Sequence, residues 1–161
     1  MAEVFLSVGS NLGNRKANCE LALQRLNQKR HRVVKRSSFY RTRPLGLTDQ
    51  PNFLNIVVEL LTESSPWTLL SDLQRIEKEI GRRRSVRWGP RLIDLDIIFF
   101  DRKVIKEKRL TVPHPLIQER GFVLIPLLEI APDIAHPVLN RPCSTLLAEL
   151  NEPSDSVIKI D

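Results

Sequence analysis

Two aspartates separated by a single leucine, Asp94 and Asp96, are the side chains of this sequence best placed to hold a metal ion. They lie in an apolar run, residues 92–100, whose β-branched and aromatic residues predict a strand. Side chains alternate along a strand, so both carboxylates lie on one face, roughly 7 Å apart. On a partly buried face they repel each other and lose hydration, and a divalent cation removes that conflict. Magnesium is commonly held by one or two carboxylates together with substrate phosphates.

The segment just before the aspartates, residues 81–91, is rich in arginine and contains Trp88-Gly89-Pro90. Glycine and proline are typical of a loop that takes up a few defined positions, and Trp88 could close over an aromatic ligand. Arginines on such a loop would neutralise charge that develops on phosphates during transfer. A solvated basic loop and a solvated Asp-x-Asp turn are the alternatives for either motif alone. Because Ile98 and Phe100 are expected to share the face of the aspartates, we favour a metal-bound polyphosphate.

Asn55 and Phe53 fall on one face of another predicted strand, residues 53–61. A primary amide offers a donor and an acceptor side by side, which suits the edge of a heterocycle, and Phe53 could stack on the face of the ring. Thr42, at the end of the neighbouring predicted strand, could add a second edge contact. The alternative is an asparagine that bonds only to nearby backbone.

Three more polar side chains near these motifs have two interpretations each. Gln74 and Glu77 lie one turn apart, near the end of a predicted helix that leads into the arginine-rich loop. They either contact a ligand or belong to an exposed helix face. His114 stands between two prolines, so its backbone is rigid. Its imidazole either binds a phosphate, takes part in proton transfer, or has a structural role.

The elements that must position these side chains follow the order strand, helix, strand, strand, helix, strand. The predicted strands are 4–9, 32–42, 53–61 and 92–100, and the predicted helices are 14–28 and 65–81. A small hairpin is expected over 104–105 and 110–112, and a helix over 117–130 interrupted near Pro126. This order is that of a ferredoxin-like α+β sandwich, in which helices pack on an antiparallel sheet. The expected architecture is a βαββαβ core followed by C-terminal helices.

Length and composition favour one globular domain. The chain has 161 residues, enough for a single domain over 1–161, and its composition of 42% hydrophobic and 27% charged residues is that of a folded protein. We expect residues 151–161, which are polar, to form a loosely held tail. The formal net charge of +6 favours anionic partners without choosing among them.

The sequence also indicates where in the cell the protein is expected. No apolar stretch approaches the roughly 20 residues that a membrane helix needs, and the first residues do not resemble a signal peptide. Cys19 and Cys143 are far apart and lack metal-ligand spacing, which is typical of reduced thiols. We therefore expect a cytoplasmic protein without a membrane partner.

Many segments of the chain, between about residue 3 and residue 150, resemble the 6-hydroxymethyl-7,8-dihydropterin pyrophosphokinase family of folate biosynthesis. The string from Arg87 to Asp96, Arg-Trp-Gly-Pro-Arg-x-x-Asp-x-Asp, is the most specific of them. The other similar segments are Gly9-Ser10-Asn11-Leu12-Gly13, Ser38-Phe39-Tyr40-Arg41-Thr42, Pro44-Leu45-Gly46, Asp49-Gln50-Pro51, Phe53-Leu54-Asn55, Leu110-Thr111-Val112-Pro113-His114-Pro115 and Glu119-Arg120-Gly121-Phe122-Val123-Leu124.

The resemblance implies transfer of pyrophosphate from ATP to the hydroxymethyl group of 6-hydroxymethyl-7,8-dihydropterin, with release of AMP. Asp94 and Asp96 would hold two Mg²⁺ ions that bridge the ATP phosphates, while Arg82 and Arg91 would steady the phosphates during transfer. The positions that match nucleotide contacts in the family are Gln74, Glu77, Arg84, Ile97, Arg109, Thr111, His114, Pro115 and Arg120. The positions that match its pterin pocket are Thr42, Leu45, Phe53, Asn55, Trp88 and Phe122, with the ring held between Phe53 and Phe122.

Under this interpretation the partners are ATP and the pterin, without nucleic acid, and we expect a monomer. An RNA-binding module of the same fold is the first alternative, but the sequence lacks the aromatic string that such sheets carry. A two-metal phosphohydrolase or nuclease is the second, and it would need more carboxylate or histidine ligands. A P-loop kinase is disfavoured because residues 9–13 lack the Gly-Lys-Ser/Thr ending.

Overall fold

The computed structural model describes residues 1–27, 30–43, 51–81, 92–151 and 156–160. The strands are β1 Ala2–Ser10, β2 His31–Arg36, β3 Tyr40–Thr42, β4 Phe53–Thr62, β5 Asp94–Phe100, β6 Ile105–Lys106, β7 Thr111–Val112 and β8 Val157–Lys159. The α-helices are α1 Arg15–Leu26, α2 Pro66–Ile80, α3 Gly121–Ile130 and α4 Cys143–Glu149, and a short 3₁₀ helix, η1, covers Ile117–Glu119.

The main sheet is antiparallel, with strand order β5-β1-β4-β3-β8, and β2 also pairs with β4. The first strand therefore lies between β4 and β5, the strands that precede and follow α2. This is the ferredoxin-like arrangement, and the predicted fold class is confirmed. The small β6–β7 hairpin was also predicted correctly.

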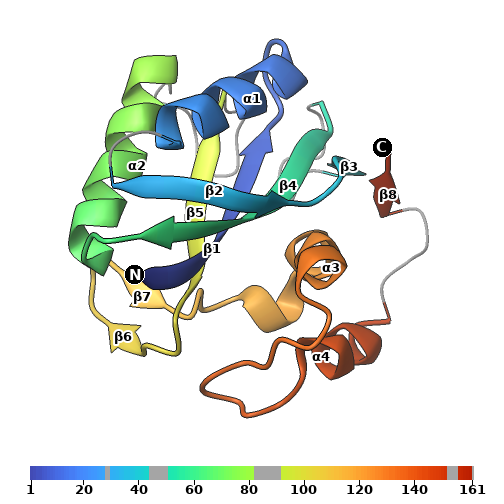
Figure 1. The fold of residues 1–161 in the computed structure, drawn as a ribbon. Helices are drawn as coiled ribbons and strands as arrows, with labels where there is room; N and C mark the ends of the chain where they lie inside the picture. The colour runs from blue at the N-terminus through green and yellow to red at the C-terminus, as the bar shows by residue number, and fades with distance from the viewer. Residues whose placement is uncertain (28–29, 44–50, 82–91, 152–155, 161) are drawn as a thin grey trace.

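Helices cover both faces of the sheet, so the molecule has two apolar cores (Figure 1). The α1–α2 core contains Val4, Leu6 and Val8 of β1 together with alternate residues of β4 and β5. The α3–α4 core contains Phe5 and Val57 from the opposite face of the same strands. Period-two alternation is what allows one strand to serve both cores.

The two long helices begin where the sequence predicts. The Asn14 side chain accepts a hydrogen bond from the Ala17 amide at 3.1 Å, and Ser65 caps α2 in the same way through Thr68. Gly81 ends α2 in the left-handed region, at φ 101°, which a residue with a side chain rarely adopts. These local signals fix the two ends of α2, and the arginine-rich segment follows it in the sequence.

Two expectations for the strands were wrong. The predicted strand 32–42 is two strands, β2 and β3, and at the break the Ser37 amide donates to the Val57 carbonyl at 2.9 Å while the Ser37 hydroxyl, in place of its carbonyl, accepts from the Val57 amide at 3.0 Å. Phe100 does not share the face of the aspartates, because Ile98 is an extra residue in the β1–β5 register. After this bulge Phe100 turns into the α1–α2 core, while Ile98 faces the α3–α4 core as expected.

The C-terminal segment and the predicted helix over 117–130 also differ from expectation. Val157–Lys159 form β8 on the edge of β3, and the Ile160 amide donates to the Phe39 carbonyl at 2.9 Å, so these residues are not a loose tail. Exposed backbone groups at a strand edge favour such an addition. Pro126 lies inside α3, and the interruption comes instead at Arg120, between η1 and α3. Among the described residues, no helix combines the length and the apolar character needed to cross a bilayer.

Candidate active site

The site lies on the α3 face of the sheet, around the last residues of β1. Gly9 is paired with Asn55 of β4 on one side and with Asp94 of β5 on the other. Residues directly opposite each other in an antiparallel ladder project to the same face. With neighbouring strands about 4.8 Å apart, the backbones of Asn55 and Asp94 are roughly 10 Å apart across Gly9. The amide and the first carboxylate thus share one surface.

Gly9 itself was not recognised as a site residue in the sequence. A Cβ on Gly9 would lie 2.6 Å from Asn55 Oδ1 and 3.6 Å from the Phe53 ring, so a larger residue would displace the Asn55 amide. The available signal was a glycine inside a strand, which often marks close approach of another group.

The amide side of the site is preorganised. Asn55 and Thr42 are each 4% exposed, and Asn55 Nδ2 donates to Thr42 Oγ1 at 2.6 Å. Phe53 is opposite Thr42 in the β3–β4 register and is only half-buried. A ring lying over Phe53 would therefore meet a fixed amide at its edge.

The carboxylate side is more open. Asp96 is exposed and Asp94 is half-buried, while Leu95 between them points into the α1–α2 core, which is the predicted alternation. Within the described ranges no three His, Cys, Asp or Glu side chains are grouped to hold a metal ion. Two carboxylates with open positions suit Mg²⁺, which keeps water and substrate phosphates as further ligands. A closed structural zinc site would need four protein ligands.

Glu77 of α2 is tied to the strand that carries the carboxylates. It is 5% exposed, and its Oε2 accepts a hydrogen bond from the Leu95 amide at 2.9 Å. The interpretation of Glu77 as part of an exposed helix face is therefore wrong. Gln74, one turn earlier, is exposed. Glu77 fixes the backbone between the two aspartates.

His114 lies beside the carboxylates with a defined orientation. Its amide donates to the Ile98 carbonyl at 3.0 Å, and its Nδ1 accepts from the Leu116 amide at 3.1 Å. Burial lowers the pKa of His114, an effect that Arg120 reinforces and the negative charge of Asp96 opposes. At neutral pH the ring is therefore neutral with its proton on Nε2.

Arg120 and Phe122 come from the start of α3. The guanidinium of Arg120 lies 5.5 Å from the centre of the Phe122 ring, and both side chains are half-buried. Phe122 packs against the α3–α4 core. The structure thus brings a cation and an aromatic ring to the same face as Asn55 and Asp96.

The remaining predicted residues fall into two groups. Ile97 is buried in the α1–α2 core, so its side chain is on the face opposite the carboxylates and only its backbone could serve a ligand there. Arg109 and Pro115 are exposed, and Thr111 is half-buried with its hydroxyl donating to the Glu107 carbonyl at 3.3 Å. The predicted residues that lie outside the described part of the chain are Leu45, Arg82, Arg84, Trp88 and Arg91.

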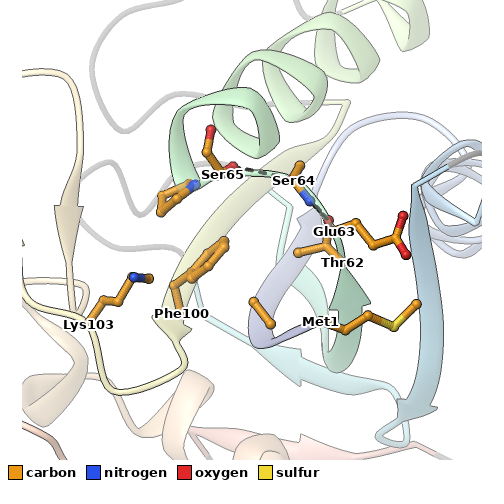
Figure 2. Close-up of a pocket in the computed structure, with 9 residues that line it drawn as sticks. Met1, Thr62, Glu63, Ser64, Ser65, Phe100 and Lys103 are labelled. Atoms are coloured by element: carbon orange, nitrogen blue, oxygen red, sulfur yellow. Dashed lines mark hydrogen bonds between the residues drawn. The ribbon is translucent and has the colours of Figure 1, made fainter.

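A hollow of about 460 Å³ lies at the other end of the sheet. Figure 2 shows Phe100, Lys103 and Met1 around it. It is formed by the start of β1 and the ends of β4 and β5, whereas Gly9, Asn55 and Asp94 are at the opposite ends of these strands. This hollow is therefore separate from the surface that carries the amide and the carboxylates.

Comparison with known proteins gives consistent matches. Residues 5–132 match the family described as 7,8-dihydro-6-hydroxymethylpterin-pyrophosphokinase (HPPK). The chain is 40% identical over 142 residues to the 2-amino-4-hydroxy-6-hydroxymethyldihydropteridine pyrophosphokinase of Aquifex aeolicus (strain VF5), covering 88% of each protein. It is 47% identical over 131 residues to the protein of that name from Bacillus subtilis (strain 168), covering 81% of this chain and 78% of that one.

Some relatives are much longer. The chain is 47% identical over 135 residues to the folic acid synthesis protein fol1 of Pneumocystis carinii, covering 84% of this chain but only 18% of that protein. Its fold superposes on Plasmodium falciparum HPPK-DHPS bound to pteroate with a TM-score of 0.75 and 16% identity, covering 92% of this chain and 42% of that one. The low identity to this structure supports the fold alone.

Proposed function

Because the chain belongs to the 7,8-dihydro-6-hydroxymethylpterin-pyrophosphokinase family, we propose that it transfers pyrophosphate from ATP to 6-hydroxymethyl-7,8-dihydropterin and releases AMP. The attacking group is the hydroxymethyl oxygen of the pterin, and the bond broken lies between the α- and β-phosphates of ATP. The single observation that carries the proposal is the ladder Asn55–Gly9–Asp94, in which an amide and a carboxylate share one face. The reaction needs those two functions side by side.

Asn55, Thr42, Phe53 and Phe122 form the pterin side of the proposed site. Asn55 meets the edge of the ring, and its bond to Thr42 holds the amide plane in place before the ligand arrives. Phe53 and Phe122 offer aromatic faces on the sheet and on α3, between which a flat bicyclic ring is held by stacking. Fixing the ring in this way orients its hydroxymethyl group toward β5.

Asp94 and Asp96 form the phosphate side and would hold two Mg²⁺ ions. Magnesium held there would neutralise phosphate charge and orient the attacking oxygen. The open, acidic surface of β5 suits these ions, and Glu77 keeps the strand rigid behind it. Neutral His114 donates from Nε2 to a phosphate oxygen, and Arg120 adds a positive charge.

The residues of the loop and of the nucleotide contacts are carried over from the family. Arg82 and Arg91 steady the phosphates during transfer, and Leu45 and Trp88 complete the pterin pocket. The other proposed nucleotide contacts are Gln74, Glu77, Arg84, Ile97, Arg109, Thr111 and Pro115. We also propose a cytoplasmic location, since Cys19 and Cys143 are both buried free thiols.

The test is AMP formation by the purified chain from ATP and 6-hydroxymethyl-7,8-dihydropterin, followed by chromatography. We expect AMP and the pterin diphosphate in equal amounts when Mg²⁺ is present, and neither product after chelation with EDTA. AMP released at the same rate without the pterin would indicate a nucleotide hydrolase instead. Release of ADP would contradict pyrophosphate transfer.

A further inference from the structure

Glu129, in the last turn of α3, makes an unusually dense set of contacts with the sheet. Its carboxylate accepts hydrogen bonds from the Ser38 amide at 3.1 and 3.0 Å, from the Ser38 hydroxyl at 2.9 Å and from the Tyr40 hydroxyl at 2.6 Å. These donors lie 91 and 89 positions away in the chain. We name this cluster of Ser38, Tyr40 and Glu129 the α3 clamp.

The clamp consists of hydrogen bonds to an ionised carboxylate at neutral pH. Burial alone would raise the pKa of Glu129, but the hydrogen bonds from Tyr40 and Ser38, with Lys159 nearby, bring it below its usual range. Burial and the Glu129 carboxylate raise the pKa of Tyr40, so its hydroxyl keeps the proton that it donates. Hydrogen bonds to an ionised acceptor are about twice as strong as neutral ones.

The clamp joins the two walls of the proposed pterin slot. On the sheet, Tyr40 is opposite Asn55 and Thr42 is opposite Phe53, so all four side chains share the face toward α3. On the helix, Phe122 is in the first turn and Glu129 in the last, about 10 Å further along the axis. Figure 1 shows the helix lying over this part of the sheet.

We propose that Glu129 is a positioning residue that sets the separation between Phe122 on α3 and the Phe53–Asn55 surface of the sheet. A helix pinned at one end keeps its other end at a fixed height, and stacking on both faces of a ring requires a defined gap. This inference rests on the proposed function, because it assigns Glu129 to the pterin side of that site. Glu129 acts through Phe122 and does not itself contact the ring.

The nucleotide side should depend much less on the clamp. Asp94 and Asp96 belong to β5, which is separated from β3 by β1 and β4. Their strand is held from the opposite face of the sheet by the bond between Glu77 and the Leu95 amide. Loss of the clamp should therefore weaken pterin binding more than nucleotide binding, since Arg120, at the start of α3, is the proposed nucleotide contact that would move with Phe122.

The experiment is calorimetric titration of the full chain with a non-hydrolysable ATP analogue plus Mg²⁺, and then with the pterin. For Glu129→Gln we expect about ten-fold weaker pterin binding, the equivalent of one charge-assisted hydrogen bond, and nucleotide affinity within about two-fold of the unsubstituted chain. Equal losses for both ligands would indicate a general structural role and overturn the proposal, as would unchanged pterin affinity.

Glu20→Gln is the matched control. Glu20 of α1 binds Arg36 of β2, so it also links a helix to the sheet through a carboxylate, but on the α1 side. We expect it to leave both affinities unchanged. A loss of pterin affinity as large as that of Glu129→Gln would show that any helix–sheet link has this effect.

Tyr40→Phe provides a second variant if Glu129→Gln fails to fold by circular dichroism. It removes one hydroxyl and keeps the ring, and we expect about five-fold weaker pterin binding from the loss of a single hydrogen bond. Unchanged pterin affinity in Tyr40→Phe overturns the positioning role. If the unsubstituted chain itself does not bind the pterin, the proposed function fails, which is a different outcome.

Discussion

The two strands that flank Gly9 present their side chains in different states. On β4, Asn55 is 4% exposed and its amide is already bonded to Thr42. On β5, Asp96 is exposed and Asp94 is half-buried, although the two strands are neighbours of the same β1 residue. The amide region is supported from α3 by the clamp, and the carboxylate region from α2 by Glu77.

This difference fits the ligands that we propose for each region. A flat ring is recognised at its edge by a fixed, desolvated donor and acceptor, since an adaptable amide would accept other rings equally well. Metal ions and phosphates bring their own strong charges and need open coordination positions. The protein therefore completes the amide region in advance and leaves the carboxylate region for the ligands to complete.

The largest effect is expected from breaking the carboxylate region. Asp96→Ala should lower the rate of AMP formation by about a thousand-fold, because bound metal is worth several kcal/mol to the transition state. The melting temperature should change little, since Asp96 is exposed. Asp133→Ala, which removes an exposed carboxylate outside the site, is the control. Near-normal turnover in Asp96→Ala would remove this side chain from the metal site.

The next effect concerns the amide region. Asn55→Ala should weaken pterin binding by about 1–3 kcal/mol, because a buried partner, Thr42, and the ring edge both lose their hydrogen bond. Nucleotide binding measured by the same titration should be unaffected if the two regions are independent. Gln24→Ala, an exposed amide on α1, should change neither. Parallel loss of both ligands would mean that the regions are one unit.

A smaller effect is expected at His136, which should change the pH dependence of stability and not the activity. His136 packs edge-on against Phe99 of β5 at 5.8 Å, and its Nδ1 accepts bonds from the Val138 and Leu139 amides. Burial lowers the pKa of His136 below 6.5, so the unfolded chain takes up its proton first as the pH falls. The contribution of His136 to the free energy of unfolding should thus be fully present above pH 6.5. It should decrease as the pH falls below 6.5, by at most about 1.4 kcal/mol per pH unit.

Denaturant titrations at several pH values test this expectation. His136→Asn keeps an acceptor near the position of Nδ1 and cannot be protonated, so it should flatten the acid limb of the stability curve. The rate of AMP formation at pH 7.5 should stay the same. An unchanged acid limb would show that other groups control the loss of stability.

The smallest effect should come from the α1 face, which supports neither region directly. The exposed pair Arg36–Glu20 contributes no more than about 0.5 kcal/mol to stability in water, so Glu20→Gln should barely move the denaturation midpoint. The rate of AMP formation should be unchanged. A large stability loss would indicate that α1 and β2 depend on this pair more than exposed ion pairs generally allow.

Local patterns predicted the side-chain positions that matter most. The alternation of Asp94, Leu95 and Asp96, the face shared by Phe53 and Asn55, and the caps at Asn14 and Ser65 all follow from short-range periodicity or from single turns. Each depends on residues within a few positions of one another. These features agree with the structure because nothing distant is needed to produce them.

The features that could not be predicted from the sequence depend on partners far away in the chain. The bulge at Ile98, which turns Phe100 away from the aspartates, depends on the register with β1. The pairing of β8 with β3 and the bond from Tyr40 to Glu129 join residues that are at least 89 positions apart in the chain. Periodicity within one segment contains no information on such partners. The role of Gly9 likewise appears only when Asn55 is placed beside it.

The two lateral margins of the described sheet are formed differently. On the outer margin of β5, Glu77 accepts from the Leu95 amide and the His114 amide donates to the Ile98 carbonyl. On the other margin, β8 saturates β3. Within the described sheet β8 is itself the outermost strand, so the backbone groups on its far side, and not those of β3, form the margin at which another extended segment could add.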